Sequence, residues 1–152
     1  MQTESGLRLM WWPKVSPPTG WHFDQDLSHH YAFKAFAPND STFADAETVI
    51  YARANFKPRT PEIKNVEALI EQDISGISHV VAERMKPLLS RNGQTFEVVS
   101  FSPKTDGNWE RVAYGEETEY YILFTVSSRT EEGLSRAIPT FQSLVASYES
   151  GP

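Results

Sequence analysis

The sequence contains no cysteine among its 152 residues. This absence excludes a thiol nucleophile, a disulfide, and a zinc or iron–sulfur site built on cysteine ligands. Long apolar runs are also missing. The densest one, Tyr120–Val126, has the length of a strand and falls far short of the ~20 residues of a membrane-spanning helix. We therefore expect no membrane insertion.

Clustered positive charge is absent as well. The chain has 14 Lys and Arg against 20 Asp and Glu, a formal net charge of −6. An acidic surface repels nucleic acid and anionic lipid, so we expect neither as a partner. Residues 1–6 have no charged start followed by an apolar stretch, so the sequence predicts no signal peptide in this chain.

Loops typical of catalysis are not found either. The glycines are isolated, so there is no phosphate-binding loop, and the glycines of a nucleophile elbow are missing around Ser127 and Ser128. Ser128 and Glu131 instead fit a helix capping box. Glu116, Glu117 and Glu119 crowd one predicted turn, where solvation is the simplest interpretation. We predict no catalytic residue and no cofactor.

The patterns that are present indicate one domain over residues 1–152, with an aromatic and proline-rich arm at residues 1–20. Alternation of apolar and polar residues predicts a series of short strands. They are Leu7–Trp12, Trp21–Phe23, Tyr31–Phe36, Thr48–Ala54, Thr95–Phe101, Trp109–Tyr114 and Tyr120–Ser127. The last strand is apolar on both faces, which predicts an interior position with cover on both sides.

Two segments have helical spacing of apolar residues. Val66–Leu89 is predicted as the longer helix, with Asn65 as its N-cap and with Ile70, Ile77 and Val81 buried against the sheet. Thr130–Tyr148 is predicted as the second helix, in which Pro139 should cause a kink or start a new segment. The fold class is therefore α+β: an antiparallel sheet of about six or seven strands packed with two main amphipathic helices.

Metal-ligating residue types gather in only one region. These are His22, Asp24, Asp26, His29 and His30, and strand spacing would place His22 and Asp24 on one face. Their spacing matches no established zinc motif, and a polar turn with exposed histidines is the alternative. We expect no tight metal site.

Three arginines lie in or beside predicted strands: Arg53, Arg111 and Arg129. Two of them on one face would form a site for an anion. Alternatively, each pairs with a nearby carboxylate across the sheet. The candidates for that pairing are Glu47, Glu110 and Glu116.

Aromatic residues are concentrated near the N-terminus, at Trp11, Trp12, Trp21 and Tyr31. They could line a binding groove. They could equally attach the N-terminal arm to the body of the domain.

Several phrases of the sequence, taken with the predicted order of elements, resemble the PsbP-like fold family. They are PTGW at Pro18–Trp21, AETVIYA at Ala46–Ala52, RVAY at Arg111–Tyr114, LFTVSSR at Leu123–Arg129 and IPTFQSLVASY at Ile138–Tyr148. The family includes PsbP, the Ran-binding Mog protein and DcrB-like bacterial envelope proteins, and the chain is most similar to bacterial members without an assigned role. The resemblance implies an α/β/α sandwich, a bacterial source, a periplasmic or exported location, and no catalytic residue.

The resulting expectation is a non-enzymatic bacterial protein that binds a protein or a small ligand. The alternative is a metal-dependent or hydrolytic enzyme that uses the His22–His30 region. The sequence leaves the partner and the oligomeric state open.

Overall fold

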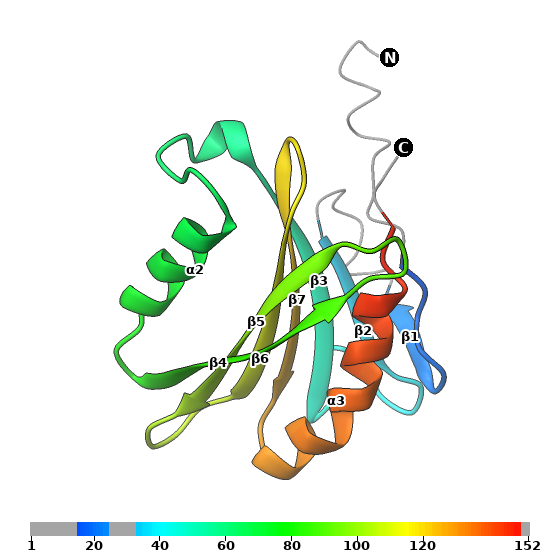
Figure 1. Ribbon diagram of the computed structural model, residues 1–152. Helices are drawn as coiled ribbons and strands as arrows, with labels where there is room; N and C mark the ends of the chain where they lie inside the picture. Colours follow the sequence, from blue (N-terminus) through cyan, green and yellow to red (C-terminus); the bar gives the residue numbers. More distant parts are fainter. Residues whose placement is uncertain (1–14, 25–32, 150–152) are drawn as a thin grey trace.

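A single antiparallel sheet of seven strands forms the centre of the computed structural model, which describes residues 15–24 and 33–149 (Figure 1). The strand order across the sheet is β1-β2-β3-β7-β6-β5-β4, and every neighbouring pair is antiparallel. The strands are β1 (Trp21–Asp24), β2 (Phe33–Pro38), β3 (Thr48–Phe56), β4 (Val80–Leu89), β5 (Thr95–Pro103), β6 (Trp109–Glu116) and β7 (Tyr120–Ser128).

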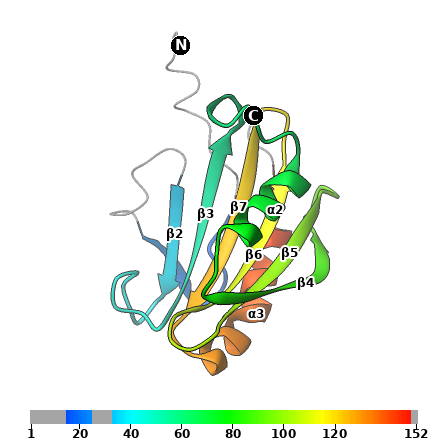
Figure 2. The same ribbon diagram turned by 90° about the vertical axis from the view of Figure 1, so that its left-hand side faces the viewer.

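One helix covers each face of the sheet. Helix α2 (Val66–Ser75) lies on one face and α3 (Glu131–Ala146) on the other, so we call these the α2 face and the α3 face (Figures 1 and 2). A short 3-10 helix, η1 (Lys57–Arg59), follows β3. The predicted fold class, an α+β sandwich with an antiparallel sheet and two main helices, is confirmed. Neither α2 nor α3 is long and apolar enough to span a membrane.

Strand β7 lies between β3 and β6, and all nine of its residues are buried. Its side chains alternate between the faces: Ile122 and Phe124 join the core under α3, whereas Tyr121 and Leu123 join the cluster under α2. The predicted interior strand with cover on both sides is therefore confirmed.

The predicted long helix Val66–Leu89 is wrong. The helix ends at Ser75 with Gly76 as its C-cap, and β4 follows as a strand paired with β5. Pro87 has no backbone N–H and clashes with the preceding turn, so it disfavours the helix interior. The adjacent Val80 and Val81 are β-branched and favour a strand.

This error also changes the predicted burial. Ile70 is fully buried in α2, as expected, but Ile77 lies in the connection to β4 and is only partly buried. Val81 is 54% exposed. In a strand, neighbouring side chains point to opposite faces, so Val80 packs into the core under α2 while Val81 points the other way.

The start of α3 differs from the predicted capping box. The N-cap is Thr130, whose Oγ1 accepts a hydrogen bond of 3.0 Å from the Gly133 N–H. Ser128 is instead buried at the end of β7, where its Oγ accepts a 2.8 Å hydrogen bond from Thr48 Oγ1. The helix continues through Pro139 without starting a new segment.

Candidate functional site

A cavity of about 590 Å³ lies on the α2 face, and we call it the α2-face cavity. It is bounded by the end of α2, the connection to β4, and the exposed parts of β3, β7, β6 and β5. Its lining residues are Tyr51, Arg53, Asp73, Ile77, His79, Val80, Phe101, Pro103, Gly107, Asn108, Glu110, Val112, Tyr114, Leu123 and Thr125.

The cavity exists because α2 is too short to cover its face. The helix has ten residues and buries only Leu69 and Ile70. Polar residues occupy the α2-face positions of the strands beyond its end, including Thr125 and Ser127 on β7. These positions are buried within the sheet but are not covered by a helix, which leaves space for a ligand.

Two carboxylates in this region are held by hydroxyl groups. The Tyr114 hydroxyl donates to Asp73 Oδ2 at 2.8 Å, which joins β6 to α2. The Ser127 hydroxyl donates to Glu110 Oε2 at 2.8 Å and accepts from Asn108 Nδ2 at 3.1 Å. No hydrogen bond within the described ranges uses the second oxygen of either carboxylate, so each could accept a donor from a ligand.

Arg53 provides the positive charge of the cavity. Its side chain is exposed, and no hydrogen bond or ion pair joins it to another described residue. Burial and the charge of Glu110 raise the pKa of the Tyr51 hydroxyl, while Arg53 acts to lower it. Burial and Asp73 similarly raise the pKa of Tyr114. Both tyrosines are therefore neutral hydrogen-bonding groups at physiological pH.

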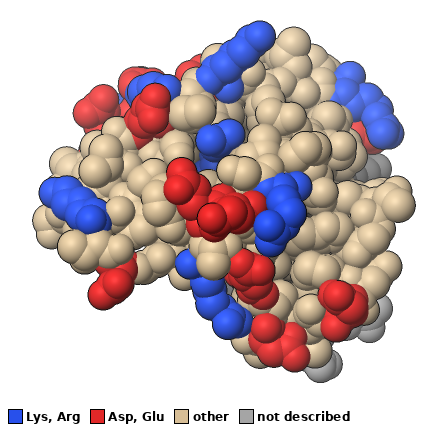
Figure 3. All heavy atoms as spheres, turned by 90° about the horizontal axis from the view of Figure 1, so that it is seen from below, with Lys and Arg blue, Asp and Glu red and all other residues tan. Residues whose placement is uncertain are grey.

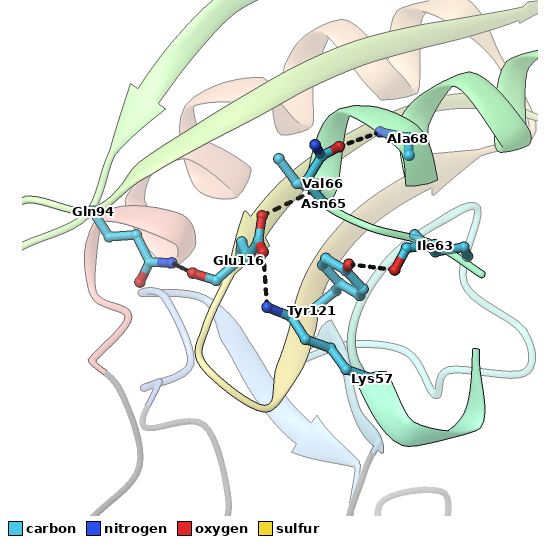
Figure 4. A network of polar contacts seen from close by, with 8 residues as sticks. All are labelled: Lys57, Ile63, Asn65, Val66, Ala68, Gln94, Glu116 and Tyr121. Carbon is cyan, nitrogen blue, oxygen red and sulfur yellow. Dashed lines mark hydrogen bonds and ion pairs between the residues drawn. The ribbon is translucent and has the colours of Figure 1, made fainter. Parts of the chain in front are cut away.

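A polar network attaches α2 to the sheet and so shapes the cavity (Figure 4). Its centre is Glu116 at the end of β6. Glu116 Oε1 accepts from the Val66 N–H at 2.9 Å, and Oε2 pairs with Lys57 Nζ at 2.7 Å. Asn65 Oδ1 caps the helix by accepting from the Ala68 N–H at 2.8 Å, as the sequence predicted.

The Glu116 carboxylate is stabilised in its charged form. Burial alone would raise its pKa, but hydrogen bonds from Lys57 and from the Val66 N–H outweigh burial and hold the pKa below the ordinary value. The negative charge also lies at the positive end of the α2 dipole. Glu116 is therefore a structural anchor, which corrects the interpretation of this residue as part of a solvated turn, whereas Glu119 is exposed as expected. Glu117 likewise accepts a 2.6 Å hydrogen bond from the Tyr148 hydroxyl.

The three predicted arginines do not converge. Arg53 lies on the α2 face, Arg111 lies on the α3 face, and Arg129 follows β7 and donates to the Asp45 and Ala46 carbonyls at 3.2 and 3.0 Å. The alternative is not met either, because none of the three forms an ion pair with Glu47, Glu110 or Glu116 in the described part of the chain. Glu47 contacts Thr130 and Arg136, Glu110 contacts Ser127, and Glu116 contacts Lys57.

The candidate metal cluster lies only partly in the described chain. His22 and Asp24 fall on one face of β1, as expected from strand spacing, and Asp24 Oδ2 accepts from the Phe43 N–H at 3.3 Å. Asp26, His29 and His30 lie outside the described residues. In residues 15–24 and 33–149, no group of three or more His, Asp or Glu could hold a metal ion.

The predicted aromatic surface is likewise only partly described. Trp21 on β1 is half-buried and packs against the core under α3. Trp11, Trp12 and Tyr31, and the predicted strand Leu7–Trp12, lie outside the described residues. Their role in binding stays a prediction.

Charged side chains of both signs are interspersed on the end of the molecule shown in Figure 3. No extended patch of one sign forms on this view of the surface. A ligand at this end would therefore be selected by local groups rather than by a broad field.

No protein-family model matches the sequence, and no curated protein matches it at a significant level. Among solved structures, the chain is similar to cyanobacterial PsbP (CyanoP) from Synechocystis sp. PCC 6803. The identity is 12%, the TM-score is 0.51, and the match covers 88% of this chain and 83% of that one. The Saccharomyces cerevisiae Ran-binding protein Mog1p matches with 9% identity and a TM-score of 0.47, over 86% and 84% of the two chains. The similarity to CyanoP shows that the chain has a PsbP-like fold, which confirms the resemblance found in the sequence.

Proposed function

We propose that the protein acts by binding, without catalysis, and that the α2-face cavity holds a small molecule carrying both a positive and a negative group. The observation that supports this most directly is the cavity itself. Its volume of about 590 Å³ falls within the ~300–1,000 Å³ typical of small-molecule sites.

The charges around the cavity indicate the type of ligand. Arg53 on β3 can bind a carboxylate through its planar N–H donors. Asp73 and Glu110 can accept hydrogen bonds from an ammonium group through their second oxygens. The apolar side chains of Ile77, Phe101 and Leu123 would contact the body of the ligand. A free amino acid with an apolar side chain has this combination of groups.

The non-enzymatic part of the proposal rests on the roles of the residues that could otherwise act chemically. Ser127 and Glu110 bond each other, Ser128 bonds Thr48, and Glu116 anchors α2. Each of these groups has a structural partner, and Ser127 bonds Glu110 directly, without the intervening histidine of a catalytic triad.

The bacterial source and the export that the sequence resemblance implies are also part of this proposal. Fractionation of the native host tests both.

The binding proposal is tested by titrating the protein with leucine, phenylalanine and acetate while amide chemical shifts are followed by NMR. We expect leucine or phenylalanine to shift the signals of β3, β7 and the end of α2, and acetate to have little effect. Arg53→Ala should weaken that binding at least tenfold.

Arg91→Ala is the matched control, because Arg91 is also an exposed arginine but pairs with Glu149 away from the cavity. It should leave the affinity unchanged. Equal effects of the two substitutions, or no shift with any of these amino acids, would contradict the proposal.

A further inference from the structure

A second cavity, on the α3 face, has a different character from the first. It occupies about 540 Å³ between β4 and α3, and we call it the β4–α3 groove. Most of its lining is apolar, and its cations are Arg111 and Lys86. The lining residues are Met85, Lys86, Pro87, Leu88, Leu89, Val98, Arg111, Phe141, Gln142 and Ala146.

Arg111 reaches this groove from the sheet. It lies on β6 opposite Ser100 of β5 and Val126 of β7, on the face whose core packs under α3. An arginine at this position is unusual, because its neighbours in that layer include the fully buried Ala113 and Phe124. The side chain therefore carries a positive charge to the edge of an apolar core.

The guanidinium of Arg111 lacks an acceptor. Its Nε atom is buried without a hydrogen-bond partner, and no ion pair in the described part of the chain includes this side chain. Glu83 lies on the same face of the sheet as Arg111, but on β4, two strands away. It affects Arg111 through its charge, without an ion pair. Burial lowers the pKa of Arg111, but an arginine stays protonated at physiological pH.

A buried donor without an acceptor is costly, and buried polar groups in folded proteins are nearly always paired. The groove provides the space in which an acceptor could reach Arg111. The acceptor that best fits a guanidinium is a carboxylate, which can take two parallel N–H bonds.

We propose that the β4–α3 groove binds a single-chain amphipathic carboxylate, with its carboxylate on Arg111 and its hydrocarbon chain along the apolar residues of β4. Met85, Leu88 and Phe141 supply the apolar contact for the chain. Lys86 adds a second positive charge at the groove. Leu89 is 64% exposed, so the chain would cover an apolar side chain that now faces solvent.

The mixed lining argues against simpler ligands. A small inorganic anion would satisfy Arg111 but would leave the apolar walls exposed to water. A neutral hydrocarbon would cover the walls but would leave the buried Nε–H without an acceptor. Only a ligand with both parts matches the whole groove.

Calorimetric titration with decanoate, decan-1-ol and acetate tests each part of the ligand separately. We expect decanoate to bind, and acetate and decan-1-ol to bind at least tenfold more weakly. Arg111→Met should reduce decanoate affinity at least tenfold, and Arg111→Lys should restore part of the loss. Binding of decan-1-ol as tight as that of decanoate would overturn the proposal.

A substitution on the surface tests the groove independently, in case the Arg111 variants fold incorrectly. Leu89→Glu places a negative charge on an exposed groove residue and should weaken decanoate binding at least fivefold. Val81→Glu is the matched control, since Val81 is an exposed residue of the same strand outside the groove lining. An unchanged affinity in Leu89→Glu, or equal losses in both variants, would overturn the proposal.

Discussion

The two faces of the sheet are stabilised in different ways. On the α3 face, a 16-residue helix buries six of its own residues against the sheet. Phe96, Phe124 and Tyr148 pack there with ring centroids 5.5–5.7 Å apart. On the α2 face, a ten-residue helix buries two residues against the sheet and is also attached by polar bonds to Glu116 and Tyr114.

This difference explains why the larger cavity lies where it does. Burial of apolar surface is the dominant source of stability, and the α3 face supplies most of it. The α2 face can then leave polar residues uncovered and still keep its helix in place through a smaller apolar cluster and hydrogen bonds. We infer that packing under α3 supplies most of the stability of the fold, whereas the shorter cover by α2 leaves room for the larger of the two cavities.

The largest expected effect is on the α3 face. Phe124→Ala should lower the free energy of unfolding by ~3–5 kcal/mol, because Phe124 is fully buried in the middle of β7 and its loss leaves a cavity. Urea unfolding monitored by circular dichroism measures this. Leu69→Ala on the α2 face is the comparison, with a loss of about 2 kcal/mol, since α2 can shift to fill the space. Equal losses would show that the two faces do not differ in stability.

A smaller effect is expected at the anchor of α2. Glu116→Gln should lower the free energy of unfolding by about 1 kcal/mol at pH 7, because it removes the ion pair with Lys57 and weakens the bond to Val66. Amide exchange should become faster in α2 and remain unchanged in α3. Glu62→Gln is the matched control, because Glu62 is an exposed glutamate in the connection between η1 and α2.

The same anchor predicts a dependence on pH. The folded-state pKa of Glu116 is below the ordinary value of 4.5, so its stabilising contribution is complete above pH 4.5. That contribution is lost as the pH falls through the lower, folded-state pKa. The difference in stability between the wild type and Glu116→Gln should therefore shrink in acid. A difference that stays constant from pH 7 to pH 3 would contradict the anchoring role.

Much of the fold could be predicted from sequence because the strand signals are local: residues 48–54 are rich in residues that favour strands, and residues 120–126 form a short, nearly continuous apolar run. The error at Val80–Leu89 has a physical cause. Apolar residues at 77, 80, 81, 85 and 88 fit helical spacing, and a bulge between Met85 and Leu88 disturbs the alternation of the strand. Gly76 and Pro87 were the signals that could have separated helix from strand.

The cavities were much harder to predict. Whether Arg53 and Arg111 share a face depends on the register of β3, β7 and β6, which the spacing of residues within one strand does not determine. The α2-face cavity joins Tyr51, Asp73 and Glu110 from distant parts of the sequence. The one local signal for it was the polar pair Thr125 and Ser127 within an otherwise apolar strand.

The smallest expected effect is that of a substitution at Val81. It tests whether Val80–Leu89 is a strand, as in the structure, or the end of the helix that the sequence predicts. In β4, Val80 packs into the core under α2, while Val81 is 54% exposed on the other side. Val81→Ser should change the free energy of unfolding by less than ~0.5 kcal/mol, as surface substitutions usually do. Val80→Ser should lower it by about 1 kcal/mol, because a partly buried side chain loses apolar contact. Urea unfolding of the two variants measures the difference.

A helix would instead bury Val81 on the same stripe as Ile70 and Ile77. A larger loss of stability at Val81 than at Val80 would therefore favour the helix and contradict β4 as the edge strand that bounds both cavities.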